Sequence, residues 1–359
     1  MVDRGGHSAR TRALVALAFG LVTGAFAAAR VLHEPHWPTD FDQLWYAATA
    51  LRNGGNPYDV VGPGRVFPWL WPLYYPLPAV LFAVPFTFLP IAAARITFSA
   101  IAAAILGWAL GERVRTHWPI VLSGAFIISA SRNQWAPILL AATWLPALGF
   151  FATAKPNVGV ATLAGQDRRG VVLAITGCLV VLAACFLVRP DWLSNWKESI
   201  QTSPHIQAAV TVLPFGPLLA LAALRWRRPD SRLFLALVLI PHTPSVYDLL
   251  LLFFVARTLR ETLALALLTQ CLYWGIVLFG SFQTFDAYAA GVGRAAIYVV
   301  YLPVLAALLV RPNEAARMET DPRKDRASVV PSNWIDAILF SLLLVTATML
   351  VWLPLITYR

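Results

Sequence analysis

Two carboxylates, Asp40 and Asp42, stand in a polar stretch between two hydrophobic segments, close to Trp37, Trp45 and Tyr46. Residues two apart point to opposite faces of an extended chain and lie about 200° apart on a helix. We therefore expect one acid to be functional and the other to be exposed. A carboxylate that aromatic rings shield from water has a raised pKa and could act as a general base. Two other interpretations stay open: both acids are solvated loop residues, or Asp40 caps a helix that starts near residue 41.

Three cationic side chains, Arg95, Arg132 and Lys155, lie within or beside apolar runs. Charged residues are rare inside membrane spans, so each is a candidate for binding an anionic group. The alternative for each is that its long side chain reaches toward the lipid headgroups.

The composition predicts an all-α integral membrane protein. Of the 359 residues, 58% are hydrophobic and 13% charged, whereas soluble domains carry about 25% charged residues. The apolar runs are continuous, which indicates helices rather than a membrane barrel. The net charge of +10 comes from short basic clusters between apolar runs, which is typical of cytoplasmic loops and does not indicate a nucleic-acid partner.

Several other classes of protein lack support in the sequence. No phosphate-binding loop of the GxxxxGK[ST] type and no GxGxxG unit is present, so nucleotide-driven transport is not indicated. The three cysteines, Cys178, Cys185 and Cys271, lie in apolar runs and predict neither a disulfide framework nor a zinc site. No His and Asp cluster has the spacing of metal ligands, so we expect no metal and no cofactor.

The arginine clusters give the membrane topology. If the clusters at 4–12, 168–169, 225–232, 257–260 and 311–326 share the cytoplasmic side, segments 33–75 and 189–205 lie outside. The run 13–29 is either a signal peptide or, as we favour, an uncleaved first helix. We expect a transmembrane domain over 1–310, a charged cytoplasmic linker over 311–332 and a C-terminal transmembrane helix over 333–359. Spans number about 10 to 13, several of them short or re-entrant between 76 and 165.

The first outside segment carries a resemblance to a known family. Its runs TDFDQLWYAA at 39–48, GNPYD at 55–59 and YPLP at 75–78 resemble the opening of the DUF2029 family. These are GT-C-fold glycosyltransferases of family 87, related to actinobacterial alpha-mannosyltransferases that use polyprenol-phosphate-mannose. Further matches are the Asn133-Gln134 break, Lys155-Pro156 and PSVYD at 244–248. Gly54 and Gly55, together with Pro57, also predict a turn at this second run.

The resemblance implies a GT-C-type bundle and a glycosyltransferase in the bacterial inner membrane. Such an enzyme transfers mannose or another hexose or pentose from a polyprenyl-phosphate donor to a lipid or cell-envelope glycan, with inversion, on the extracytoplasmic side. It assigns the general base to Asp40, with Asp42 as the alternative, and makes Arg95 a further cation for the lipid phosphate. The expected substrate-binding residues are Lys155, Arg132, Gln134, Tyr46, Tyr58, Tyr75, His242 and Asp248.

Some interpretations stay open beside this one. The family's Ser-Trp-x-His-like segment is replaced here by PSVYD, and His242 is shifted from it, so its role is open. Trp37, Trp192 and Trp196 could stack on sugars, but we favour anchors at the membrane interface. The rival function is a secondary transporter or flippase for a lipid-linked sugar. Against it, the spans are almost free of carboxylates and the acids gather outside. An inactive scaffold protein is a third possibility.

Overall fold

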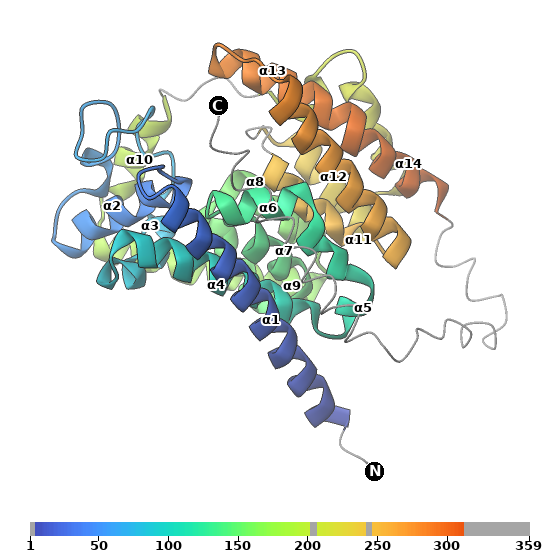
Figure 1. Ribbon diagram of the computed structural model, residues 1–359, viewed down its shortest axis with the longest axis horizontal. Coiled ribbons are helices and arrows are strands. Elements are labelled where there is room, and N and C mark those ends of the chain that lie inside the picture. Colours follow the sequence, from blue (N-terminus) through green and yellow to red (C-terminus); the bar gives the residue numbers. More distant parts are fainter. Residues whose placement is uncertain (1–3, 202–206, 242–245, 312–359) are drawn as a thin grey trace.

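The computed structural model describes residues 4–201, 207–241 and 246–311, and these form an assembly of helices (Figure 1). The described residues contain no β-strand, only one isolated bridge between Val61 and Phe67. The predicted all-α class is therefore confirmed. The linker from 312 and the C-terminal helix expected over 333–359 lie outside the described residues.

Five helical segments in the described part of the chain are long and apolar enough to cross a membrane. They contain α1 (Arg4–His33), α4 (Ile91–Leu110), α9 (Arg168–Val188), α12 (Leu259–Phe279), and the continuous run of α13 (Phe285–Ala296), η9 (Ile297–Tyr301) and α14 (Leu302–Val310). These helices support a membrane protein. The larger count of about 10 to 13 spans stays a prediction, because the other apolar helices are shorter than the roughly 20 residues of a full span.

Shorter helices occupy part of the region 76–165, where the sequence predicts short or re-entrant segments, and others lie within 216–239 and 246–254. They are α6 (Gly124–Ser131), α7 (Ala136–Trp144), η5 (Pro146–Ala154), α8 (Pro156–Ala164), η7 (Gly216–Arg225), α11 (Pro229–Leu239) and η8 (Val246–Phe254). Proline stands in the first turn of five of them, namely α7, η5, α8, η7 and α11. Proline suits a helix start and cannot continue the preceding helix, so each helix begins anew at it.

The remaining helices are short, and several of them lie together at one end of the bundle (Figure 1). At one end are α2 (Asp40–Arg52), η1 (Pro57–Asp59), α3 (Leu77–Ala83), η2 (Val84–Phe88) and α10 (Trp192–Gln201); elsewhere lie η3 (Gly111–Arg113), α5 (Val114–His117), η4 (Trp118–Leu122) and η6 (Ala209–Thr211). The turn after α2 forms as predicted. Gly54 has φ of +79°, and the Asn56 side chain accepts a hydrogen bond from the backbone N–H of Tyr58.

α1 packs along α4 through small residues (Figure 1). A Cβ on Gly107 would stand 2.8 Å from the carbonyl oxygen of Val15, so only glycine permits this approach. Phe19 and Phe26 of α1 are buried in the core. The outer end of α1 is thereby fixed beside α6, and this position matters for the site described below.

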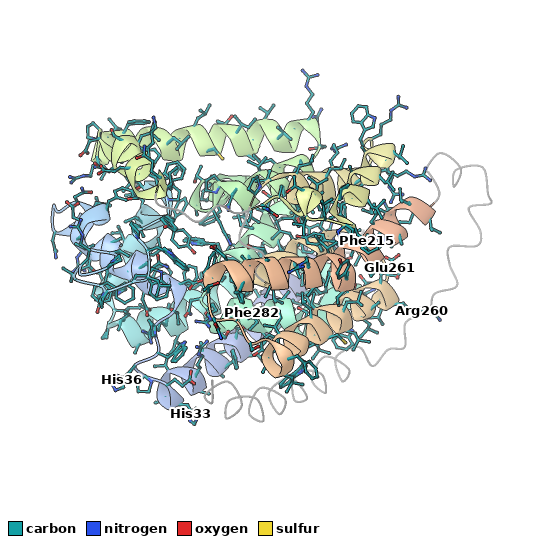
Figure 2. All side chains as sticks on the ribbon, turned by 90° about the horizontal axis from the view of Figure 1, so that it is seen from above. His33, His36, Phe215, Arg260, Glu261 and Phe282 are labelled. Atoms are coloured by element: carbon teal, nitrogen blue, oxygen red, sulfur yellow. The ribbon has the colours of Figure 1, made fainter. Side chains whose placement is uncertain are left out.

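The two predicted outside segments meet at one end of the molecule. Arg189 donates a hydrogen bond to the Gly55 carbonyl at 3.3 Å, and the indole N–H of Trp196 donates to the Tyr74 carbonyl at 2.9 Å. Figure 2 shows His33 and His36 at this end, opposite Arg260 and Glu261. The segments 33–75 and 189–201 therefore share one end, as expected of loops on the same side.

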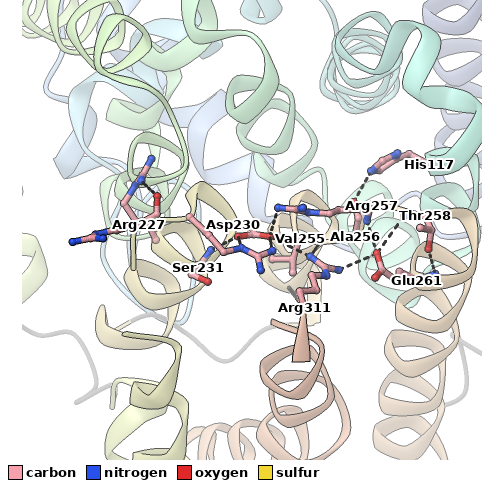
Figure 3. A network of polar contacts seen from close by, with 12 residues as sticks. His117, Arg227, Asp230, Ser231, Val255, Ala256, Arg257, Thr258, Glu261 and Arg311 are labelled. Atoms are coloured by element: carbon pink, nitrogen blue, oxygen red, sulfur yellow. Dashed lines mark hydrogen bonds and ion pairs between the residues drawn. The ribbon is translucent and has the colours of Figure 1, made fainter. Parts of the chain in front are cut away.

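Three of the basic clusters meet at the other end, around a buried carboxylate (Figure 3). Asp230 accepts hydrogen bonds from Arg228 at 2.7 Å and from Arg257 and Arg311 at 3.1 Å each. Arg311 also pairs with Glu261 at 2.9 Å. Three of the predicted cytoplasmic clusters thus come together, which agrees with their assignment to a common side.

Candidate functional site

A cavity of about 1000 Å³ opens among the helices at the end that carries the outside loops. Its volume lies at the upper end of the roughly 300–1,000 Å³ typical of small-molecule sites. Side chains from α1, the start of α2, the loop before α3, both helix breaks around α7 and η5, α10, α12 and α13 line it. The polar lining residues include Arg30, Asp40, Gln43, Ser131, Arg132, Lys155 and Asn157.

Asp40 lines this cavity from the first position of α2, which Thr39 precedes as the N-cap. Carboxylates are favoured at a helix N-terminus because the free backbone N–H groups carry partial positive charge. Gln134 donates a hydrogen bond to Oδ2 of Asp40. Burial raises the pKa of Asp40, while the charges of Arg132 and Lys155 oppose that rise. The result is a half-buried carboxylate whose raised pKa would suit a general base, and that role stays a prediction.

Asp42 has different surroundings, and the expectation that the second acid would be exposed is wrong. Its side chain is fully buried. Arg95 donates to its two oxygens, from Nε at 2.8 Å and from Nη2 at 2.6 Å. The backbone N–H and the hydroxyl of Thr39 donate to it as well, at 2.8 and 3.1 Å. This bidentate pair ties α2 to α4 and is a structural contact. Neither member lines the cavity, and the Arg95 guanidinium is directed at Asp42 instead.

Arg132 and Gln134 reach the site from the break between α6 and α7. Asn133 between them has φ of +54°, a left-handed conformation that is uncommon for residues other than glycine. Its side-chain amide donates to the Arg95 carbonyl at 2.8 Å and to Ser99 Oγ at 2.7 Å. These bonds fix the turn so that Arg132 lines the cavity and Gln134 bonds Asp40. The Arg132 guanidinium forms no ion pair or hydrogen bond with the described residues.

Lys155 enters the cavity from the second break, between η5 and α8. Its ammonium group pairs with Oδ1 of Asp248 at 2.7 Å and lies 4.6 Å from the centre of the Tyr247 ring. The Asp248 side chain is only 1% exposed and lies behind the lysine. Among the described residues its second oxygen, Oδ2, has no hydrogen-bond partner. The buried pair holds the ammonium group at the cavity wall. Asp248 therefore positions Lys155 and does not itself line the cavity.

The other predicted substrate-binding residues divide into three groups. Tyr75 lines the cavity, and burial, with the charges of Asp40 and Asp248, raises its pKa. Tyr46 stacks on Phe67 with ring centres 4.8 Å apart, and Tyr58 is buried; neither lines the cavity. His242 lies outside the described residues.

The sequence reasoning missed Arg30, a third cation of the cavity. It donates a hydrogen bond to the Ser131 carbonyl and pairs with Glu34 at 3.5 Å. A signal was available, because an arginine at the outer end of the first helix runs against the usual placing of positive charge inside. Tyr288 of α13 was missed too. It lines the cavity near the start of α13, which begins at Phe285.

Among the described residues no group of three or more histidines, cysteines and acids is arranged to hold a metal ion. The site that these residues do form has one carboxylate, Asp40, in a cavity that also contains three cations. Such a site can accept a proton from a hydroxyl at one place and stabilise an anionic group at another. Comparison of the chain with family models, curated proteins and solved structures finds no match.

Proposed function

We propose that this protein is a membrane glycosyltransferase that moves a sugar from a polyprenyl-phosphate donor to a hydroxyl of a lipid or cell-envelope glycan. The reaction would take place on the extracytoplasmic side of a bacterial inner membrane. One observation carries the proposal: Asp40, with a raised pKa, shares one cavity with Arg30, Arg132 and Lys155. The resemblance of residues 39–78 to GT-C glycosyltransferases supports the same reaction.

In the proposed reaction Asp40 accepts the proton of the acceptor hydroxyl. The acceptor oxygen then forms a bond to the anomeric carbon of the donor sugar. The bond between that carbon and the phosphate oxygen breaks, and its electron pair leaves with the polyprenyl phosphate. Attack from the face opposite the leaving group inverts the anomeric centre. Gln134 holds the Asp40 carboxylate in place through its amide.

The three cations suit the phosphate, which gains negative charge as it leaves. Hydrogen bonds from charged donors are the stronger ones, and fixed donors aimed at developing charge lower a barrier most. Arg30 and Lys155 have carboxylate partners in Glu34 and Asp248. The Arg132 guanidinium forms no ion pair or hydrogen bond with the described residues, so its N–H groups are the ones that a substrate anion could engage.

The test is reconstitution of the full chain into proteoliposomes with radiolabelled polyprenyl-phosphate mannose, glucose, galactose and arabinose and a bacterial envelope-lipid extract. The expected result is consumption of one donor, with release of polyprenyl phosphate and a new glycosylated product. Movement of intact donor across the bilayer without cleavage would instead establish a flippase and overturn the proposal. Failure to consume any of the donors would contradict it as well.

A further inference from the structure

Four aromatic side chains form one side of the cavity, and we refer to them as the aromatic wall. Trp71 and Tyr74 come from the first outside segment, Trp196 from α10 and Phe285 from the start of α13. All four are half-buried and line the cavity. Three segments far apart in the sequence therefore contribute rings to the same surface.

The rings of the aromatic wall support one another. Trp71 and Tyr74 lie within 27° of parallel with centres 6.3 Å apart, and Phe285 meets Trp71 edge to face at 4.8 Å. The indole N–H of Trp196 donates to the Tyr74 carbonyl at 2.9 Å. Contacts of these kinds hold aromatic rings in fixed orientations. The wall is consequently built before any ligand arrives.

The position of the wall differs from that of membrane anchors. Interfacial tryptophans place their rings at the level of the lipid headgroups on the outside of a bundle. Trp71 and Trp196 instead line a cavity that also contains Asp40 and Arg132. The expectation that Trp196 is an anchor therefore does not describe its surroundings, whereas Trp192 is buried in the core.

The wall continues directly into the part of the cavity that holds the base. Tyr75 follows Tyr74 in the chain and lines the cavity together with Asp40, to which Gln134 donates a hydrogen bond. A molecule with one hydroxyl at Asp40 would thus extend over Tyr74 and onto Trp71 and Trp196. A pyranose ring fits such a surface, because its C–H face is apolar and packs on an aromatic ring while its hydroxyl groups stay at the rim.

We propose that the aromatic wall binds a pyranose ring of the acceptor, next to the sugar whose hydroxyl reacts, so that the acceptor is a glycoside of at least two rings. This inference rests on the proposed function for the identity of the reacting hydroxyl. It goes beyond that function by selecting a glycan over a simple lipid alcohol. The wall is then the element that determines specificity for the acceptor.

Binding of free glycosides tests this proposal without requiring transfer. The full chain in nanodiscs is titrated with methyl mannosides, glucosides and galactosides of one, two and three rings, and affinity is measured by calorimetry. For at least one sugar, the second ring is expected to tighten binding about tenfold, roughly 1.4 kcal/mol. Trp71→Ala and Trp196→Ala should each abolish that gain. Trp71→Tyr should keep most of it, and so should Trp226→Ala, which removes a tryptophan that is 60% exposed and lies outside the cavity.

The outcomes separate this proposal from the proposed function. Thermal melting of each variant shows whether it folds. Because the two alanine variants change different segments, the test remains possible if one of them fails to fold. Equal affinity for one and two rings with all three sugars, or a gain that survives both alanine changes, overturns the wall as a sugar site. If the gain depends on the wall but no donor is consumed, the sugar site stands and the proposed transfer reaction falls. If a donor is consumed but the second ring does not tighten binding, the proposed transfer reaction stands and the sugar site falls.

Discussion

Asp40 and Asp42 are separated by one residue and have opposite surroundings. Asp40 faces the cavity with a raised pKa, while Asp42 is fully buried against Arg95. The sequence predicted one working carboxylate from the 100° advance per residue along a helix. It did not predict the ion pair, because Arg95 lies 53 residues away and nothing in its local pattern indicates a partner.

Replacing each acid by asparagine should affect stability in opposite ways. Asp42→Asn leaves the Arg95 guanidinium buried without its counter-charge, which costs about 3–5 kcal/mol. Asp40→Asn removes a carboxylate whose ionised form the folded state disfavours, so the free energy of unfolding at neutral pH should stay the same or rise. Thermal unfolding in one detergent measures both. A larger loss of stability in Asp40→Asn than in Asp42→Asn would contradict this assignment.

The raised pKa of Asp40 predicts an acid limb in the pH dependence of transfer. Transfer needs the ionised carboxylate, so kcat/KM should fall tenfold per pH unit below the pKa. Burial places that pKa above the ordinary value of about 3.9. The free energy of unfolding depends on pH in the opposite direction. Protonated Asp40 favours the folded state, so the stability that it contributes at low pH is lost as pH rises through its raised pKa. An identical acid limb in the residual activity of Asp40→Asn would assign the limb to another group.

At the scale of elements, two helix breaks supply Arg132, Gln134 and Lys155 to the site. The sequence indicated both breaks, at 131–135 and at Lys155-Pro156, because polar residues and proline interrupt apolar runs that are too short to span a membrane. It could not show that the breaks face one cavity. That arrangement depends on how α6, α7, η5 and α8 pack, which is set by contacts between distant residues.

Asn133 tests the role of the first break. Asn133→Ala and Asn133→Gly both lose the hydrogen bonds to the Arg95 carbonyl and Ser99. Only the alanine variant also has a Cβ in the left-handed conformation, which costs roughly 1–2 kcal/mol. We expect slower transfer in both variants and a lower melting temperature in Asn133→Ala than in Asn133→Gly. Equal melting temperatures would show that the positive φ of residue 133 is not maintained.

At the scale of the whole molecule, the chain has one end rich in arginine and one end that carries the aromatic loops. Charge clusters predicted this division, because the topology signal is compositional and needs no knowledge of packing. The sequence did not predict the start of α13. Residues 285–296 include Asp286, Arg294 and two glycines, so they lack the continuous apolar pattern of a membrane span. The helix nevertheless begins at Phe285, and Tyr288 reaches the cavity as a result.

The Asp230 network should contribute to the stability of the arginine-rich end. Burial alone would raise the pKa of Asp230, but the hydrogen bonds and charges of Arg228, Arg257 and Arg311 outweigh burial and lower it. Asp230→Asn should therefore reduce the free energy of unfolding by about 3–5 kcal/mol at neutral pH. The contribution is present above the unfolded pKa of about 3.9 and is lost as pH falls through the lowered pKa.

Asp191→Asn is the matched control for that measurement. Its side chain is 56% exposed and pairs with Arg189 at 3.3 Å, and exposed pairs contribute only about 0–1 kcal/mol. Unfolding by denaturant at several pH values compares the two variants with the wild type. Equal, small losses in both would mean that the cluster does not hold α11, α12 and α14 together.

The rate at which Asp40→Asn releases polyprenyl phosphate from the donor tests the central claim most directly. The measurement uses the donor that the wild type consumes, in the same proteoliposomes, with melting temperatures showing that the variant is folded. Loss of a general base lowers a rate by about 10²–10⁴-fold, and we predict a fall of this size with little change in donor binding. Release at the wild-type rate by folded Asp40→Asn would contradict the account.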